Sequence, residues 1–149
     1  MQTTTAGDCI QLNAEVFLEV DNVDFGFCAG SHMRALATGS RVHARSNYAI
    51  SGGAQCHMHS ANGGYIQTST RTVTISGTPA FTGGSAPFPA FAIAQLGGKI
   101  AARGNTFSGS ATGVRYNALG IGAVDVNGAS ITYLPGDTAG STSAGGQYY

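Results

Sequence analysis

The sequence predicts an all-β protein: a short right-handed parallel β-helix, or β-solenoid, of about four coils. Three observations favour this fold. A pattern that opens with an apolar residue, followed by small residues and glycines, returns at Phe25, Ile50, Ile75 and Phe107. The first two steps are equal, at about 25 residues, which is room for three short strands and three turns, and the third step is longer. The pattern has no helical periodicity, and its apolar residues recur at strand-like positions.

Composition narrows the class of protein further. The chain has 149 residues, enough for one domain, and 42% of them are hydrophobic and periodically placed, which excludes disorder for most of the chain. Charged residues make up only 9%, the formal net charge is zero, and Lys99 is the single lysine. We therefore expect neither nucleic-acid binding nor membrane insertion, since there is no basic patch and no apolar run of spanning length.

The three cysteines are Cys9, Cys28 and Cys56, and their spacing matches no zinc or redox motif. We expect reduced thiols that pack as small apolar side chains in a protein made in a reducing cytoplasm. A disulfide between subunits, formed by one of these thiols, is the alternative.

The segment before the repeat is divided into two parts. Residues 1–9 are polar and are expected to form a flexible lead-in. Apolar and polar residues alternate from Ile10 to Val20, which predicts a half-buried strand within residues 10–24. This strand either begins the first coil or covers the open end of the solenoid, because an uncovered terminal coil exposes unpaired backbone groups.

Residues 25–128 hold the predicted coils, with three columns of inward side chains. The columns are Phe25, Ile50, Ile75 and Phe107; then Ala29, Ala54 and Ala111; then Val42, Ile66 and Ile100, continued by Ile121 or Val124. Many of these side chains are small, so each coil buries little apolar area and association with other copies is expected. An outward apolar strip would meet the other copies: Phe27, Met33, Met58, Tyr65 and Tyr116.

Two segments interrupt or follow the coils. The longer third step places a loop insertion at residues 82–89, which contain two prolines and two glycines. Residues 129–149 depart from the repeat. We expect a last strand at 131–134 and then, from Thr138 onward, either a flexible tail or an extended arm that packs on a partner subunit.

The last third of the chain carries a family resemblance. Residues 133–136 (YLPG), 145–148 (GGQY) and 106–116 resemble the closing part of tail-fibre and tailspike-like proteins of bacteriophages and prophages. The resemblance implies a homotrimeric β-helical part of the virion tail, assembled in the cytoplasm of the host bacterium. It also implies contacts with other tail proteins and with a host cell-surface glycan or protein. No catalytic residue comes with it.

Aromatic side chains are the candidates for a binding surface. Flat rings with a polar edge stack well on sugar rings, and they also suit packing between subunits. The candidates are Tyr48, Tyr65, Phe88, Tyr116 and Tyr133.

Histidines are candidates for a metal site, and no other cofactor is expected. His32 and His57 occupy equivalent positions in successive copies of the repeat, so their rings are expected to stack on neighbouring coils. His57 and His59 are two positions apart, which in a strand places both on one side. Three such pairs around a threefold axis would offer six imidazoles to one divalent metal ion. The alternative is that these histidines only pack.

Two further functions compete with an adhesive tail component: a polysaccharide depolymerase and a passive trimerisation module. A glycoside hydrolase needs two carboxylates about 5–9 Å apart. Glu19 and Asp21 share one polar face, and Asp125 also points outward. No basic cluster accompanies them in the sequence, so we expect a binding protein rather than an enzyme.

Overall fold

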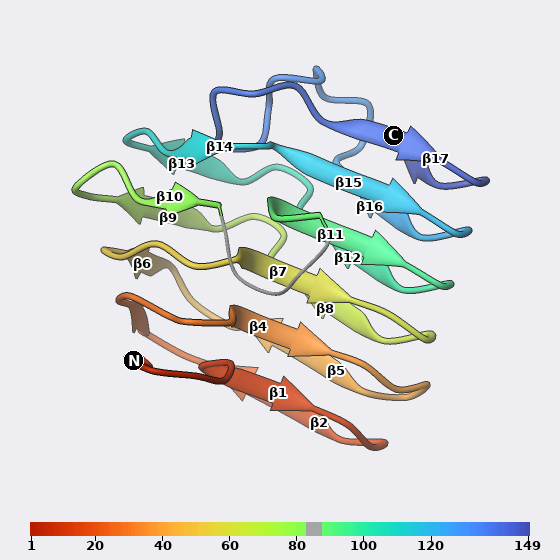
Figure 1. Cartoon of the computed structure of the whole chain (residues 1–149), viewed down its shortest axis with the longest axis horizontal. Helices are drawn as coiled ribbons and strands as arrows, with labels where there is room; N and C mark the ends of the chain where they lie inside the picture. Colours follow the sequence, from red (N-terminus) through yellow and green to blue (C-terminus); the bar gives the residue numbers. More distant parts are fainter. Residues whose placement is uncertain (83–87) are drawn as a thin grey trace.

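The computed structural model describes residues 1–82 and 88–149. The chain is an all-β parallel solenoid (Figure 1), which confirms the predicted fold class. It has about six coils rather than four, because the segments before Phe25 and after Gly128 each complete a coil. None of the described residues form a helix long and apolar enough to cross a membrane.

Three parallel sheets form the walls of the solenoid. The first wall contains β1 (Ile10–Leu12), β4 (Ser31–Ala35), β7 (Cys56–Ser60), β11 (Ala90–Gln95), β15 (Tyr116–Leu119) and β17 (Ser141–Ser143). The second wall contains β2 (Phe17–Val20), β5 (Arg41–Ala44), β8 (Tyr65–Gln67), β12 (Lys99–Ala101), β16 (Ala123–Asp125) and β18 (Gln147–Tyr148). The third wall contains β3 (Asp24–Phe25), β6 (Tyr48–Ile50), β9 (Thr72–Ile75) and β13 (Thr106–Ser108). A short pair, β10 (Ala80–Phe81) and β14 (Thr112–Gly113), stands beside it.

The first expected column forms in part. Phe25 pairs with Ile50, and Ile50 pairs with Ile75, as the equal spacing in the sequence predicts. Phe107, however, pairs with Val73 and not with Ile75. The step across the insertion is therefore longer on this wall than the sequence pattern indicated.

The third expected column is complete. Val42, Ile66, Ile100 and Val124 pair in turn along the second wall, and all four are fully buried. Ile121, the other candidate for the end of this column, lies in a turn and is 73% exposed.

The second expected column is only partly correct. Ala54 and Ala111 are buried, but Ala29 is partly exposed. Cys28 takes the inner position instead, and its thiol donates to the carbonyl oxygen of Ser31 at 3.1 Å. All three cysteines are free thiols in the single chain.

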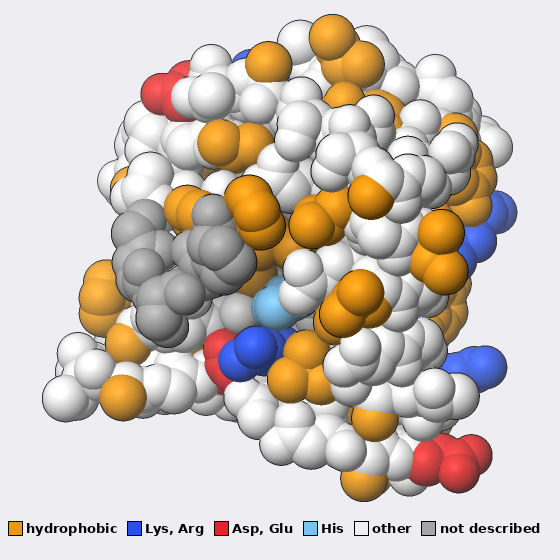
Figure 2. All heavy atoms as spheres, turned by 45° about the vertical axis from the view of Figure 1, so that its right-hand side comes forward, with side chains coloured by type: hydrophobic (Ala, Val, Ile, Leu, Met, Phe, Trp, Pro, Cys, Tyr) orange, Lys and Arg blue, Asp and Glu red, His pale blue; other side chains and the backbone are white. Residues whose placement is uncertain are grey.

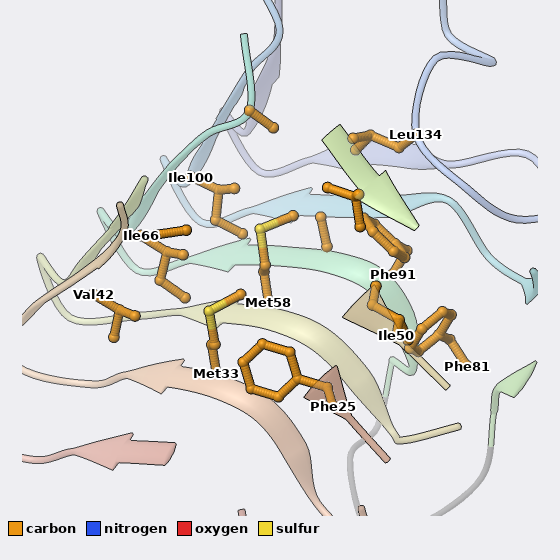
Figure 3. Close-up of a cluster of buried hydrophobic side chains, with 14 of the residues drawn as sticks. Phe25, Met33, Val42, Ile50, Met58, Ile66, Phe81, Phe91, Ile100 and Leu134 are labelled. Atoms are coloured by element: carbon orange, nitrogen blue, oxygen red, sulfur yellow. The ribbon is translucent and has the colours of Figure 1, made fainter. Parts of the chain in front are cut away.

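The core lies along the solenoid axis. Figure 3 shows Met33 and Met58 side by side on neighbouring strands, pointing into it, and both are fully buried. Tyr116 is buried as well. The apolar strip predicted on the outer surface therefore does not form, and only Phe27 and Tyr65 of that set reach solvent.

The N-terminal residues are part of the solenoid rather than a free lead-in. The Thr3 amide donates to the Phe27 carbonyl, and the Cys9 amide donates to the Ser31 carbonyl. The alternating segment from Ile10 to Val20 is not one strand either. It forms β1 and β2 on two different walls, with a corner between them.

The C-terminal residues form the last coil rather than an arm. β17 pairs with β15, and β18 pairs with β16. The expected strand at 131–134 is absent, and this segment instead closes the end of the core. Leu134 is 1% exposed, and the Tyr133 ring packs against Phe107 with centroids 5.4 Å apart. The predicted insertion at 82–89 falls mostly outside the described residues.

Glycines at the corner between the first and second walls let the coils stack closely. They recur in successive coils: Gly64, Gly98, Gly122 and Gly146. A Cβ atom at any of these positions would lie closer than 3.0 Å to a backbone carbonyl oxygen of the preceding coil. Any side chain there would push the two coils apart, which explains why glycine recurs at this position of the repeat.

Candidate functional site

The five aromatic residues expected at the surface differ in how far they are buried. Tyr48 and Tyr116 are each only 6% exposed, and Tyr133 is partly buried at the end of the core. The Tyr116 ring stacks on Tyr148 with centroids 4.0 Å apart. The expectation that Tyr48 and Tyr116 form surface platforms is therefore wrong.

Two of the five remain available to a ligand. Phe88 is 48% exposed, at the edge of the described part of the chain. Tyr65 is partly exposed on β8, on the outer side of the second wall. Among the described residues, other candidate ligand-binding side chains surround Tyr65, as described below.

His57 and His59 do not face one side, contrary to the prediction. His57 is fully buried and packs between core rings, with centroids 5.5 Å from Phe25 and 4.9 Å from Phe91. His59 lies on the outer side of the first wall, where its Nε2 is 3.0 Å from the side-chain amide of Gln95. The pair of parallel imidazoles that the threefold metal site requires is therefore not present.

A local irregularity in strand pairing explains why His57 and His59 face opposite sides of the wall. The ladder between β4 and β7 pairs Ser31 with Cys56 and Met33 with Met58, but it skips His57. Two consecutive residues, His57 and Met58, therefore face the core, and the alternation resumes after them. The described residues contain no group of three or more His, Cys, Asp or Glu side chains that could hold a metal ion.

His32 and His57 meet on neighbouring coils as predicted, but their rings lie edge-on, with 74° between the planes, rather than stacked. Their Nδ1 atoms are 3.1 Å apart, and both rings are fully buried. Burial lowers the pKa of His32 to about 4 and holds the pKa of His57 well below its ordinary value. The pKa of His59 is also lowered to about 4, mainly by burial. These rings are neutral side chains of the structure at physiological pH.

Exposed aromatic and basic side chains gather on the outer side of the second wall, which we name the second-wall face. Strand register places Phe17, Arg41, Tyr65 and Lys99 in one row, with one residue from each coil. A second row runs beside it: Glu19, His43, Gln67, Ala101 and Asp125. Figure 2 shows Lys and Arg side chains at the right-hand edge of the molecule, and others near the centre and at the top of the visible face.

A shallow pocket of about 160 Å³ opens on the second-wall face between Phe17 and Tyr65. Phe17 is 61% exposed, and its ring stacks on His43 with centroids 6.4 Å apart. The guanidinium carbon of Arg41 lies 5.9 Å from the centre of the Tyr65 ring. Gln67 completes the polar side of the pocket. The pocket therefore combines two ring surfaces with a cation and an amide.

Asp125 anchors the far end of this face. Its carboxylate is 1% exposed and pairs with Lys99 at 3.2 Å and with Arg103. Burial by itself raises the pKa of Asp125, but hydrogen bonds from Arg103 and Lys99 outweigh burial and hold the pKa below its usual value. Asp125 is thus an ionised structural carboxylate.

The near end of the face has a second ion pair. Glu19 lies 3.3 Å from Arg45 and 3.6 Å from His43. Among residues 1–82 and 88–149, no carboxylate pairs with Arg41. Four cations (Arg41, Arg45, Lys99 and Arg103) and three carboxylates (Glu19, Asp125 and Glu15, which lines a neighbouring pocket with Phe17 and Arg41) thus lie on or beside this face, in a chain whose formal net charge is zero.

Glu19 and Asp125 are too far apart to form a hydrolytic pair. Glu19 and Asp125 stand in the same row but four ladder steps apart, which is about 19 Å at the usual strand spacing. Glycoside hydrolysis needs roughly 5–9 Å between the two groups. Asp21, the other candidate, is exposed just beyond the end of β2.

Sequence reasoning missed Phe17 and Arg41 as members of a site. The available signal is spacing, because the step from Phe17 to Arg41 equals the step from Arg41 to Tyr65. No protein-family model, no curated protein and no solved structure matches the chain. The likeness to phage tail proteins stays an interpretation of the sequence.

Proposed function

We propose that the chain is an adhesive structural domain of a bacteriophage tail, from a tail fibre or tailspike, that attaches the virion to a host-surface glycan. The second-wall face is the observation that carries this proposal. It offers the exposed Phe17 ring on the edge strand β2 and the Tyr65 ring on β8, with Arg41 between them on β5, and both β5 and β8 have neighbouring strands on each side. Rings stack on sugar faces, and a prearranged surface loses little entropy on binding.

A homotrimer belongs to the same proposal. Several large apolar side chains remain exposed in the single chain, among them Leu96 (59%), Ile131 (64%) and Ile121 (73%). Exposed apolar groups of this size are often covered in assemblies. The C-terminal resemblance supports three copies, with other tail proteins as further partners and the virion tail as the location.

The attachment function is tested by binding to cells. A fluorescently labelled chain is incubated with a panel of bacteria, and bound label is measured by flow cytometry. We expect binding to at least one strain, with a large loss in the double variant Phe17→Ala, Tyr65→Ala. Phe27→Ala, which removes a similarly exposed ring away from this face, is the matched control and should bind like the unaltered chain.

The location is tested separately. Antibodies against this chain, applied to particles from a lysate that contains it, should label tails in negative-stain micrographs. Label on capsids, or particles without label, would contradict the tail assignment.

A polysaccharide depolymerase is the enzymatic alternative, and it gains no support from the wide separation of Glu19 and Asp125 along the second wall. The release of new reducing ends from a bound polysaccharide, lost in Asp125→Asn in a folded variant, would overturn the adhesive proposal. A passive trimerisation module would bind no cells in the cytometry experiment.

A further inference from the structure

Arg41 is the one basic side chain of the second-wall face with no carboxylate partner among the described residues. Its neighbours in the row are Phe17 on one side and Tyr65 on the other. The guanidinium lies near the Tyr65 ring, 5.9 Å from its centre, and borders the pocket. Such a group attracts an anion, and its planar fork suits the two oxygens of a carboxylate.

The spacing of residues along the row indicates the length of the ligand. Phe17 and Tyr65 are two ladder steps apart, roughly 10 Å along the solenoid axis. This is about the length of one disaccharide, so each ring can support one sugar. Arg41 then stands where a carboxylate on one of the two sugars would lie.

The surrounding charges favour the same class of ligand. Of the carboxylates near this row, Glu19 and Asp125 are held by basic partners, and Glu15 lines a second pocket with Phe17 and Arg41. Among the described residues none of these three carboxylates lies within ion-pairing distance of Arg41, so its guanidinium can attract an acidic polymer.

We propose that the pocket between Phe17 and Tyr65 binds a carboxylate-bearing polysaccharide, with sugar rings on the two aromatic side chains and a carboxylate on Arg41. This inference rests on the proposed attachment function and names its ligand class. Binding is non-covalent, so the proposal includes no chemical step.

Affinity electrophoresis or calorimetry with polygalacturonic acid tests the inference, with the methyl-esterified polymer as the neutral counterpart. We expect the acid form to bind the unaltered chain at least about tenfold more tightly than the ester. Arg41→Gln should remove most of this preference, while weak binding to the ester persists. Phe17→Ala should weaken binding to both polymers, because it removes a ring platform.

Arg71→Gln is the matched control, since it removes the same charge outside the pocket. Equal losses in Arg41→Gln and Arg71→Gln would overturn the site, because they would indicate only general attraction to the chain. Dextran sulfate binding as tightly as the uronate would overturn the choice of a carboxylate. Circular dichroism of each variant verifies that the solenoid is folded.

The two proposals fail in different ways. If the chain attaches to cells but does not bind polygalacturonic acid, the ligand class is wrong and the attachment function stands. If it binds no cells but binds the acid polymer through Arg41, the pocket stands and the attachment function is wrong.

Discussion

The Nδ1 atoms of His32 and His57 face each other at 3.1 Å inside the solenoid, so only one of them carries a hydrogen. His32 Nε2 lies 3.0 Å from the carbonyl oxygen of Gly26, which can only accept, so His32 is protonated on Nε2 and accepts at Nδ1. His57 therefore donates from Nδ1, and its Nε2 accepts from the Tyr48 hydroxyl at 2.9 Å. This chain of hydrogen bonds has one direction and holds both rings neutral.

Acidification is expected to destabilise the protein well above the range where carboxylates titrate. Burial lowers the pKa of His32 and His59 to about 4 and that of His57 further, whereas in the unfolded chain all three have their ordinary value near 6.5. The unfolded chain therefore binds protons that the folded chain does not. The stabilisation is complete above about pH 6.5 and is lost as pH falls towards about 4, by about 1.4 kcal/mol per pH unit for each ring. Urea unfolding followed by circular dichroism at several pH values measures the slope.

His57→Gln tests how much one ring contributes to the change of unfolding free energy with pH. Glutamine keeps a donor and an acceptor but does not titrate, so the slope between about pH 6 and about pH 5 should fall by about one third. A slope equal to that of the unaltered chain would show that His57 titrates normally in the folded state.

Tyr48→Phe is expected to destabilise the solenoid by about 1–3 kcal/mol, because the buried Nε2 of His57 loses its donor. The ring itself still fits against Phe25, whose centroid is 5.9 Å away. Chemical denaturation at neutral pH gives the difference. Tyr65→Phe removes the same hydroxyl on the outer surface and should change stability by less than about 0.5 kcal/mol. Equal effects of the two substitutions would contradict the internal hydrogen bond.

Gly122→Ala is expected to lower stability strongly, by about 2 kcal/mol or more, because its Cβ would collide with the carbonyl oxygen of Ala94 in the preceding coil. Thermal unfolding reports the loss. Gly26→Ala is the control, since its new Cβ would meet chiefly the flexible side chain of Gln2 at 3.2 Å. Equal melting temperatures for the two alanine variants would show that close stacking of the coils is not the reason for glycine at position 122.

Light scattering tests the proposed trimer. Three chains of 15.0 kDa should give about 45 kDa, and melting should shift to higher temperature as the protein concentration rises. Leu96→Asn, which removes an exposed apolar side chain at a turn with positive φ, should weaken assembly without harming the fold. A monodisperse single chain with concentration-independent melting would refute the trimer.

Constant spacing is what made part of this structure predictable. The pairing of Phe25 with Ile50 and the contact of His32 with His57 follow from the equal repeat step, because every coil repeats the same geometry. The same reasoning failed where a coil departs from it. Simple alternation puts Met58 outside, but the irregular pairing at His57 turns both residues inward.

The candidate site was harder to predict for a related reason. Phe17 belongs to an alternating run that reads as one strand, and nothing in the run marks the corner before it. Once β2 is placed on the second wall, Phe17 falls in the row of Arg41 and Tyr65. The contact therefore depends on a turn that the sequence does not signal.

The hydrogen bonds between coils run along the solenoid axis, and this orientation determines how the protein responds to a mechanical load. A pull between the two ends stretches the ladders of all the walls at each junction together, and the weakest junction gives way first. A released coil of about 24 residues can then extend to roughly 80 Å, from a rise of about 5 Å in the stack. The chain would therefore lengthen one coil at a time and absorb work at each step, with a longer step for the coil between Met58 and Ala92, which holds the insertion.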